Sequence, residues 1–184
     1  MPVTYGGGIV NLNQIEQIIS LGIERVSINS FGLENTHFFE RAVQKFGSST
    51  ILCSIDVKKN KKNNYDIYTQ NGKKLHYRNL HDTLQLLSQI EVGEIIINSI
   101  DNDGVLQGYD FDLLSVIINN CDIPVTIIGG ASSIDDFKKA IEMGASAVSA
   151  GSMFVFYGPL KAVLINYPSK EEVMQLENTI KHGK

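Results

Sequence analysis

The sequence is poor in the patterns that mark metal centres, disulfide frameworks and membrane spans. Its two cysteines, Cys53 and Cys121, stand far apart without Cys-x-x-Cys spacing, which excludes a cysteine metal motif and suits a reducing compartment. The four histidines show no ligand spacing either. The longest apolar stretch, residues 147–157, is far shorter than the roughly 20 residues of a membrane span. We expect no metal and no other cofactor.

Excess positive charge and a leader sequence are also missing. The 184 residues carry 16 Lys and Arg against 20 Asp and Glu, a formal net charge of -4, so no basic face for nucleic acid is expected. The densest basic run, residues 58–62, lies among asparagines and is typical of a solvated loop. The amino terminus has neither the charged start nor the apolar core of a signal peptide. We expect a cytoplasmic protein that binds neither nucleic acid nor membrane.

Short apolar runs alternate with amphipathic segments along the chain. The runs are nearly continuous in apolarity, as in parallel strands that are buried on both faces. The predicted strands are Pro2–Tyr5, Arg25–Asn29, Ile51–Asp56, Glu94–Asn98, Pro124–Ile128 and Ala147–Ala150. The predicted helices are Leu12–Leu21, Glu34–Phe46, Leu80–Ile90, Asp110–Asn119 and Ile134–Met143, with N-caps at Asn11 and Ser133 and terminal glycines at Gly22 and Gly144. This alternation predicts a parallel α/β sheet or barrel.

Residues 57–78 form one long connection. Within it, Asn71-Gly72 separates two short alternating runs, and Asn-Gly is a strong signal for a β-hairpin. We predict a hairpin excursion beside the barrel mouth rather than a further barrel strand.

An internal repeat relates the first part of the chain to a later part. Pro2-Val3-Thr4 with Gly7-Gly8 recurs 122 residues later as Pro124-Val125-Thr126 with Gly129-Gly130. One strand–helix–strand unit has therefore been used twice, about half a barrel apart. A closed barrel of this type requires eight strands, so the six predicted strands indicate either an open sheet or two β/α units missing upstream. The repeat favours the barrel.

Glycine and polar residues follow the predicted strands, where parallel barrels carry their active sites. Glycines there let backbone N–H groups approach phosphate oxygens, although turn-making is the structural alternative. Gly8 with Asn29-Ser30 would form one phosphate grip, and Gly129-Gly130 with Gly151-Ser152 a second. Two like grips predict a substrate with a phosphate at each end.

Asp56 is the candidate for proton transfer. It ends a predicted strand, and a carboxylate above an apolar barrel core can have a pKa suited to that task. A bond to a neighbouring loop or an ion pair with Lys58 is the structural alternative. Asp101 and Asp103 are equally consistent with a turn, which Asp and Gly commonly build.

Several motifs occur together, in order, up to about Phe156. They are Val3-Thr4-Tyr5-Gly6-Gly7-Gly8-Ile9, Val26-Ser27-Ile28-Asn29, Phe46-Gly47-Ser48, Ser54-Ile55-Asp56, Gly93-Glu94-Ile95, Ser99-Ile100-Asp101-Asn102-Asp103-Gly104, Gly108-Tyr109-Asp110, Gly129-Gly130-Ala131 and Gly144-Ala145. Together they resemble the cyclase subunit of imidazole glycerol phosphate synthase, the HisF-type family of histidine biosynthesis. The resemblance implies a (β/α)8 TIM-type phosphate-binding barrel, here one partial domain over residues 1–184 that lacks the first two β/α units.

The resemblance also implies a lyase reaction in a heterodimer with a HisH-type glutaminase. Ammonia from that partner would pass through the barrel and attack a bisphosphorylated formimino ribulosyl substrate, giving imidazole glycerol phosphate and aminoimidazole carboxamide ribotide. Asp56 takes one of two acid/base roles, and Arg25 and Glu94 fall at the ammonia entrance. Phosphate binding falls on Gly8, Asn29, Ser30, Gly104, Gly129, Gly130, Gly151 and Ser152, with Asp103 assisting.

Two departures from the family pattern keep other functions open. The strand that carries the other catalytic aspartate is absent, so we do not expect this chain alone to catalyse the full reaction, and an inactive module that only docks a glutaminase is one alternative. The carboxyl end, residues 154–168, and Asn98 resemble the paralogues found with surface-polysaccharide genes, which are thought to supply ammonia for sugar amidation. Gly108-Tyr109-Asp110 argues against the sister isomerase barrel of the histidine pathway.

Overall fold

The central feature is a parallel sheet of six strands. A computed structural model describes residues 2–158 and 160–182, and its strands follow the order β1-β2-β3-β6-β7-β8. They are β1 (Thr4–Gly6), β2 (Arg25–Ile28), β3 (Ile51–Lys59), β6 (Glu94–Ser99), β7 (Val125–Ile128) and β8 (Ala147–Val148). Each overlaps a predicted strand, which confirms the α/β class and the six parallel strands of a partial TIM-type barrel.

The contacts within the chain divide it into two compact units. Unit 1 comprises residues 1–97 and 120–124, and unit 2 comprises residues 98–119 and 125–184. The last residues of β6, Asn98 and Ser99, therefore belong to unit 2. The single domain expected over residues 1–184 stays a prediction.

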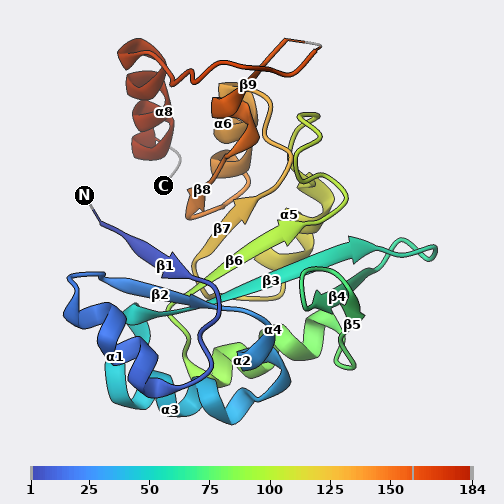
Figure 1. Ribbon diagram of the computed structural model, residues 1–184. Coiled ribbons are helices and arrows are strands. Elements are labelled where there is room, and N and C mark those ends of the chain that lie inside the picture. Colours follow the sequence, from blue (N-terminus) through green and yellow to red (C-terminus); the bar gives the residue numbers. More distant parts are fainter. Residues whose placement is uncertain (1, 159, 183–184) are drawn as a thin grey trace. The chain divides into compact units, whose positions relative to one another are not determined.

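The helices of unit 1 lie on one face of its strands (Figure 1). They are α1 (Leu12–Ser20), α2 (Ser30–Glu34), α3 (Thr36–Phe46) and α4 (Leu80–Ile90), with a 3-10 turn at Ser48–Thr50. Each longer helix turns an apolar stripe inward, and Ile15, Phe39 and Leu84 are fully buried. Burial of such a side chain stabilises the fold by roughly 1.5–3 kcal/mol. This packing holds the carboxyl ends of β1 and β2 in place.

The connection after β3 is an antiparallel extension of the sheet. Strand β4 (Tyr65–Thr69) pairs antiparallel with both β3 and β5 (Lys74–Leu75). The turn at Asn71-Gly72 has positive φ at both residues, which confirms the predicted hairpin. The predicted end of β3 at Asp56 is wrong, because β4 supplies backbone partners that extend β3 to Lys59.

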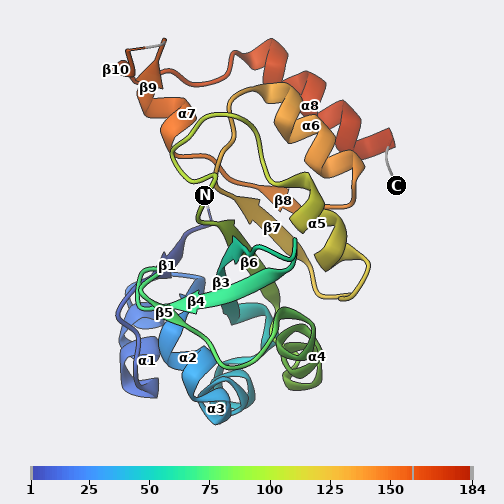
Figure 2. The same ribbon diagram turned by 90° about the vertical axis from the view of Figure 1, so that its right-hand side faces the viewer.

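Unit 2 contains β7 and β8, the helix α5 before them, and the elements that follow them. Its elements are α5 (Phe111–Ile118), α6 (Ile134–Glu142), α7 (Ser152–Val155), β9 (Phe156–Tyr157), β10 (Ala162–Val163) and α8 (Lys170–His182). Helices α6 and α8 run side by side (Figure 2). The segment from α7 to α8 has no counterpart among the predicted elements, because two-residue strands and a mostly polar helix leave little periodic signal.

The internal repeat extends to the helix caps. Asn11 and Ser133 each form a capping box with the residue three positions on, Gln14 and Asp136. Gly22 and Gly144, just past the ends of α1 and α6, adopt φ of 88° and 106°. The N-caps and terminal glycines predicted for both helices are therefore confirmed.

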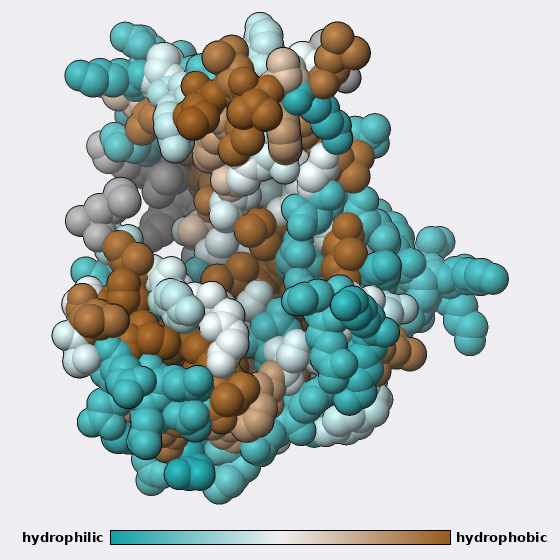
Figure 3. All heavy atoms as spheres, in the orientation of Figure 1, coloured by the Kyte–Doolittle hydropathy of each residue, from teal (hydrophilic) through white to brown (hydrophobic). Residues whose placement is uncertain are grey.

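Apolar side chains gather over β1 and α1 on the face that Figure 3 shows. Val3, Tyr5 and Val10 are roughly half exposed, and Leu21 is 82% exposed. In the described sheet β1 pairs only with β2, so its other edge is open, as expected for the first strand. Among the described residues, no helix combines the length and apolarity needed to cross a bilayer.

Candidate functional site

A cavity of about 460 Å³ lies at the carboxyl ends of β1 and β2 in unit 1. Its walls include Gly8, Asn29 and Ser30, three of the predicted phosphate-binding residues. Gly7 and Gly8 have φ of 112° and 71°, and a Cβ added at either would meet nothing within 4 Å. Backbone conformation, not crowding, therefore requires glycine here. We refer to this cavity and its lining as the unit 1 half-site.

Asp56 lies beside this half-site, in the middle of the extended β3. The Asn29 amide donates a hydrogen bond of 2.8 Å from Nδ2 to Oδ2 of Asp56. The carboxylate is half-buried, and its backbone pairs with Tyr68 of β4. The ammonium of Lys58 lies 5.5 Å from the centroid of the Tyr68 ring. The predicted acid/base residue and a predicted phosphate ligand thus contact each other directly.

The β4–β5 turn covers part of the unit 1 half-site, which the sequence did not indicate. The backbone N–H of Gln70 donates to the Ser30 hydroxyl at 2.8 Å, and Asn71 lines the cavity. Glu34 of α2 anchors this turn, because it accepts hydrogen bonds from Thr69 at 3.0 Å and from Lys74 at 2.9 Å. These bonds hold the pKa of Glu34 below its ordinary value, the contact with Lys74 most of all.

A second, smaller cavity of about 110 Å³ lies in unit 2. The predicted phosphate residues of this unit line it: Asp103, Gly104, Gly129, Gly130, Gly151 and Ser152. The backbone is crowded, because a Cβ at Gly129 would lie 2.5 Å from the side-chain oxygen of Asn98 and one at Gly130 would overlap the Gly108 carbonyl. The Gly108 N–H also donates to the Gly130 carbonyl at 2.8 Å. We refer to this cavity and its lining as the unit 2 half-site.

The loop after β6 is a tight turn. A turn is one interpretation that the sequence allows for Asp101 and Asp103. The N–H groups of Asn102 and Asp103 both donate to the Ser99 carbonyl, at 3.1 and 3.0 Å. The turn brings Asp103 and Gly104 to the unit 2 half-site. Asp101 is exposed and does not line that cavity.

Lys161 reaches the unit 2 half-site from the carboxyl-terminal segment, in which the sequence predicts no site residue. It lies in the turn between β9 and β10, and its ammonium donates to the Gly104 carbonyl at 3.0 Å. Lys161 and Gly104 are 57 residues apart in the sequence. A contact between such distant residues leaves no local motif that could identify the lysine.

Arg25 and Glu94 form an ion pair at the amino-terminal ends of β2 and β6, both within unit 1. The guanidinium Nη1 lies 2.8 Å from Oε2 of Glu94, whose side chain is only 15% exposed. The structure therefore brings together the two charged residues assigned to the ammonia entrance. Strand direction places them at the opposite end of the strands from Gly8 and Asn29.

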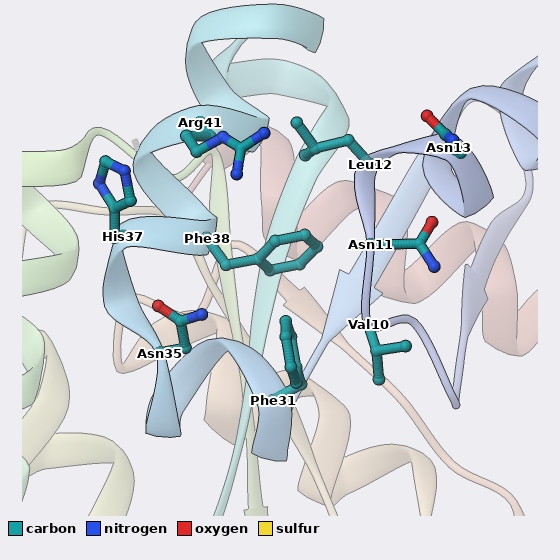
Figure 4. A pocket seen from close by; sticks show the side chains of 9 residues that line it. All are labelled: Val10, Asn11, Leu12, Asn13, Phe31, Asn35, His37, Phe38 and Arg41. Carbon is teal, nitrogen blue, oxygen red and sulfur yellow. The ribbon is translucent and has the colours of Figure 1, made fainter.

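A further cavity of about 270 Å³ adjoins the unit 1 half-site, and Val10 and Phe31 line both (Figure 4). Its floor is the edge-to-face pair of Phe31 and Phe38, whose ring centroids are 5.0 Å apart. The Arg41 guanidinium lies beside the Phe38 ring, whereas His37 points away (Figure 4). The cavity offers mainly apolar contacts and one cation.

The part of the chain that the structure describes contains no group of three His, Cys, Asp or Glu side chains placed to hold a metal ion. Cys53 is fully buried in β3, and burial raises the pKa of its thiol far above the ordinary value. A thiol in that state is a poor nucleophile and a poor ligand.

The profile described as "Histidine biosynthesis protein" matches residues 1–161. The chain belongs to this family. Within the histidine biosynthesis family, it is 36% identical over 156 residues to "Imidazole glycerol phosphate synthase subunit HisF" of Dictyoglomus thermophilum, a match that covers 85% of this chain and 62% of that protein.

Two further relatives match more of the chain. One, of Leptospira interrogans, is named "Putative imidazole glycerol phosphate synthase subunit HisF"; the identity is 40% over 94% of this chain and 68% of the relative. The other, of Pseudomonas aeruginosa, is named "Putative imidazole glycerol phosphate synthase subunit hisF2"; the identity is 44% over 91% of this chain and 67% of the relative. The chain thus spans about two thirds of the length of these curated relatives.

Proposed function

We propose that the chain is the cyclase subunit of an enzyme of the imidazole glycerol phosphate synthase type. It would use ammonia from a glutaminase subunit to split a bisphosphorylated formimino ribulosyl substrate into imidazole glycerol phosphate and aminoimidazole carboxamide ribotide. The observation that carries the proposal is the contact between Asn29 and Asp56 beside a glycine-lined cavity. It joins a proton-transfer group to a phosphate-binding loop.

Each half-site would bind one phosphate group of the substrate. Glycines with positive φ point successive backbone N–H groups into a concave surface, which is the way proteins commonly bind phosphate oxygens. Gly7-Gly8 in unit 1 and Gly129-Gly130 in unit 2 both have this conformation. In unit 1 the side chains of Asn29 and Ser30 add polar groups, and in unit 2 Ser152 does so.

Asp56 would transfer the proton in the chemical step. Its hydrogen bond from Asn29 fixes the orientation of the carboxylate, and β3–β4 pairing fixes its backbone. A positioned general acid or base typically contributes ~10²–10⁴-fold to the rate.

The Arg25–Glu94 pair would lie at the ammonia entrance, where a HisH-type glutaminase would dock. The reaction would take place in the cytoplasm, since both cysteines are free thiols and free thiols persist in reducing compartments.

The decisive experiment measures imidazole glycerol phosphate formation by the chain with a HisH-type glutaminase, glutamine and the formimino ribulosyl substrate. A synthetic segment that carries the two β/α units expected upstream is added in a second series. We expect product in the complemented reaction and a loss of ~10²-fold or more in kcat for Asp56→Asn, with substrate affinity nearly unchanged.

Asp66→Asn is the matched control, because Asp66 lies on the partner strand and accepts a hydrogen bond from Asn60. It should retain wild-type kcat. Stimulated glutaminase without any imidazole product would contradict the cyclase and favour the docking module.

The sugar-amidation paralogue is the second candidate, favoured by the carboxyl-terminal segment. In unit 2, β9 pairs antiparallel with β10, in the stretch where the chain departs from the histidine-pathway pattern. For this candidate the ammonia would leave the barrel unreacted. Isotopically labelled glutamine should then label an amidated sugar when the matching amidotransferase is added.

A further inference from the structure

The charge balance of the unit 2 half-site is unfavourable for a phosphate. Among the described residues that line this cavity, the only charged side chain is that of Asp103. A phosphomonoester carries a charge of about -1.5 to -2 at neutral pH. Backbone N–H groups supply partial positive charges, but the Asp103 carboxylate in the same wall repels the anion, so the assisting role expected of Asp103 requires a cation that offsets its charge. A cation is therefore needed close by.

Lys161 is placed to supply that cation. Its ammonium donates to the Gly104 carbonyl at 3.0 Å, and Gly104 lines the cavity. Gly104 in turn faces Ser152, whose hydroxyl would lie 3.8 Å from a Cβ added at position 104. A lysine ammonium has three donors, so two remain when one is bound to the Gly104 carbonyl.

The unit 1 half-site has no equivalent of this lysine. The repeat offset of 122 residues maps Lys161 onto Phe39, which is fully buried in the core of unit 1. None of the described residues that line the unit 1 cavity carries a charge. The two half-sites therefore share their glycine backbone but differ in charge.

We propose that Lys161 is the counter-charge of the unit 2 half-site and makes it selective for a doubly charged phosphate. The ammonium stays on the Gly104 carbonyl and donates a further hydrogen bond to a phosphate oxygen. The unit 1 half-site, whose lining residues are uncharged and whose Asn29 contacts the Asp56 carboxylate, offers no cation from its lining and discriminates less between a dianion and a monoanion. This inference rests on the proposed phosphate binding and adds the residue that tells the two ends of the substrate apart.

The test is an NMR titration of the full chain with methyl phosphate, a dianion at mildly alkaline pH, and with dimethyl phosphate, a monoanion. The amides of Gly104 and Gly130 report on unit 2, and the amide of Gly8 reports on unit 1. We expect Lys161→Met to weaken methyl phosphate binding in unit 2 by about tenfold or more, as for loss of a charged hydrogen bond. Lys161→Arg should restore affinity to within about threefold.

Two controls distinguish the effect of the Lys161 charge at the unit 2 half-site from the effect of a change in the net charge of the protein. Lys170→Met removes the same charge from an exposed position at the start of α8 and should leave both titrations unchanged. The Gly8 titration should be the same in all variants. Preserved dispersion of the amide resonances verifies folding, and Lys161→Gln replaces Lys161→Met if the latter unfolds.

The outcomes distinguish this inference from the proposed function. The Gly104 and Gly130 amide shifts give the dissociation constant of methyl phosphate in unit 2. If this constant is equal in the wild type and in Lys161→Met, Lys161 only holds the β9–β10 turn in place and the inference is wrong. If methyl phosphate shifts neither these amides nor that of Gly8 in the wild type, the proposed phosphate binding itself fails, and the role of Lys161 with it.

Discussion

The two half-sites use the same glycine pair under different constraints. In unit 1, Gly7 and Gly8 face open space, and only their positive φ demands glycine. In unit 2, Gly129 and Gly130 have positive φ and are also wedged against Asn98 and the Gly108 carbonyl. One repeat therefore preserves a backbone conformation while the surroundings of the two copies have diverged.

The two half-sites also differ in cavity volume and in the hydrogen bonds that surround each cavity. The unit 1 cavity is the larger, about 460 Å³ against about 110 Å³, and the exposed turn at Gln70 covers part of it. In unit 2 the buried Tyr109 donates from its hydroxyl to the Ser149 carbonyl at 2.9 Å, at the end of β8. The unit 1 half-site is thus the larger and is partly covered by a surface turn, whereas the unit 2 half-site is smaller and lies beside a strand end that a buried tyrosine braces.

The largest expected difference concerns the second glycine of each pair. Gly130→Ala combines an unfavourable φ with overlap at the Gly108 carbonyl, and should destabilise unit 2 by about 2–5 kcal/mol. Gly8→Ala meets only the unfavourable φ and should destabilise unit 1 by about 1–2 kcal/mol. Hydrogen exchange at the amides of β7 and β2 measures the two units separately. Equal losses of stability in the two units would contradict the distinction between an open and a crowded glycine pair.

A smaller difference is expected at the tyrosines. Tyr109→Phe removes the hydrogen bond to Ser149 and should destabilise unit 2 by about 1 kcal/mol. Tyr5→Phe is the matched control in unit 1, because the Tyr5 side chain is 47% exposed; it should change stability by less than about 0.5 kcal/mol. Urea denaturation of both variants is the measurement. A Tyr109→Phe protein as stable as the wild type would show that the phenol does not brace β8.

The smallest expected effect is a pH dependence of unit 1. His76 follows β5 and is 6% exposed, and burial, together with the charge of Arg78, lowers its pKa below 6.5. The unfolded chain therefore binds a proton more readily than the folded chain, so stability falls as the pH drops below about 6.5. His76→Gln should weaken this dependence in urea midpoints measured between about pH 7.5 and 5.5. His37→Gln, at an exposed position, is the control, and an unchanged slope in His76→Gln would contradict the assignment.

Much of this architecture could be predicted from local patterns. The six parallel strands, helix α4 with its bounds, both N-caps and the Asn71-Gly72 turn follow from period, cap chemistry and turn chemistry. These signals are local because each depends on residues within a few positions of one another. The glycine pairs are recognisable in a different way, because the same short motif occurs twice at a fixed offset.

The contacts that refine the site are not local. Nothing in the sequence near Asp56 shows that β3 continues past it, since that depends on pairing with β4. The Lys161 contact with Gly104 and the Glu34 contact with Lys74 join distant segments through single side chains. Such contacts follow from tertiary packing, which periodicity does not encode.

The antiparallel pairing of Asp56 with Tyr68 restricts how this part of the chain can change in length. Side chains alternate between the faces of a strand, so a one-residue slip of β3 against β4 would carry the aspartate to the other face. An insertion or deletion between the two strands must therefore be absorbed in the tip at residues 60–64, outside the paired positions. The tip can therefore lengthen, whereas the β3–β4 pairing fixes which residue of β4 lies opposite Asp56.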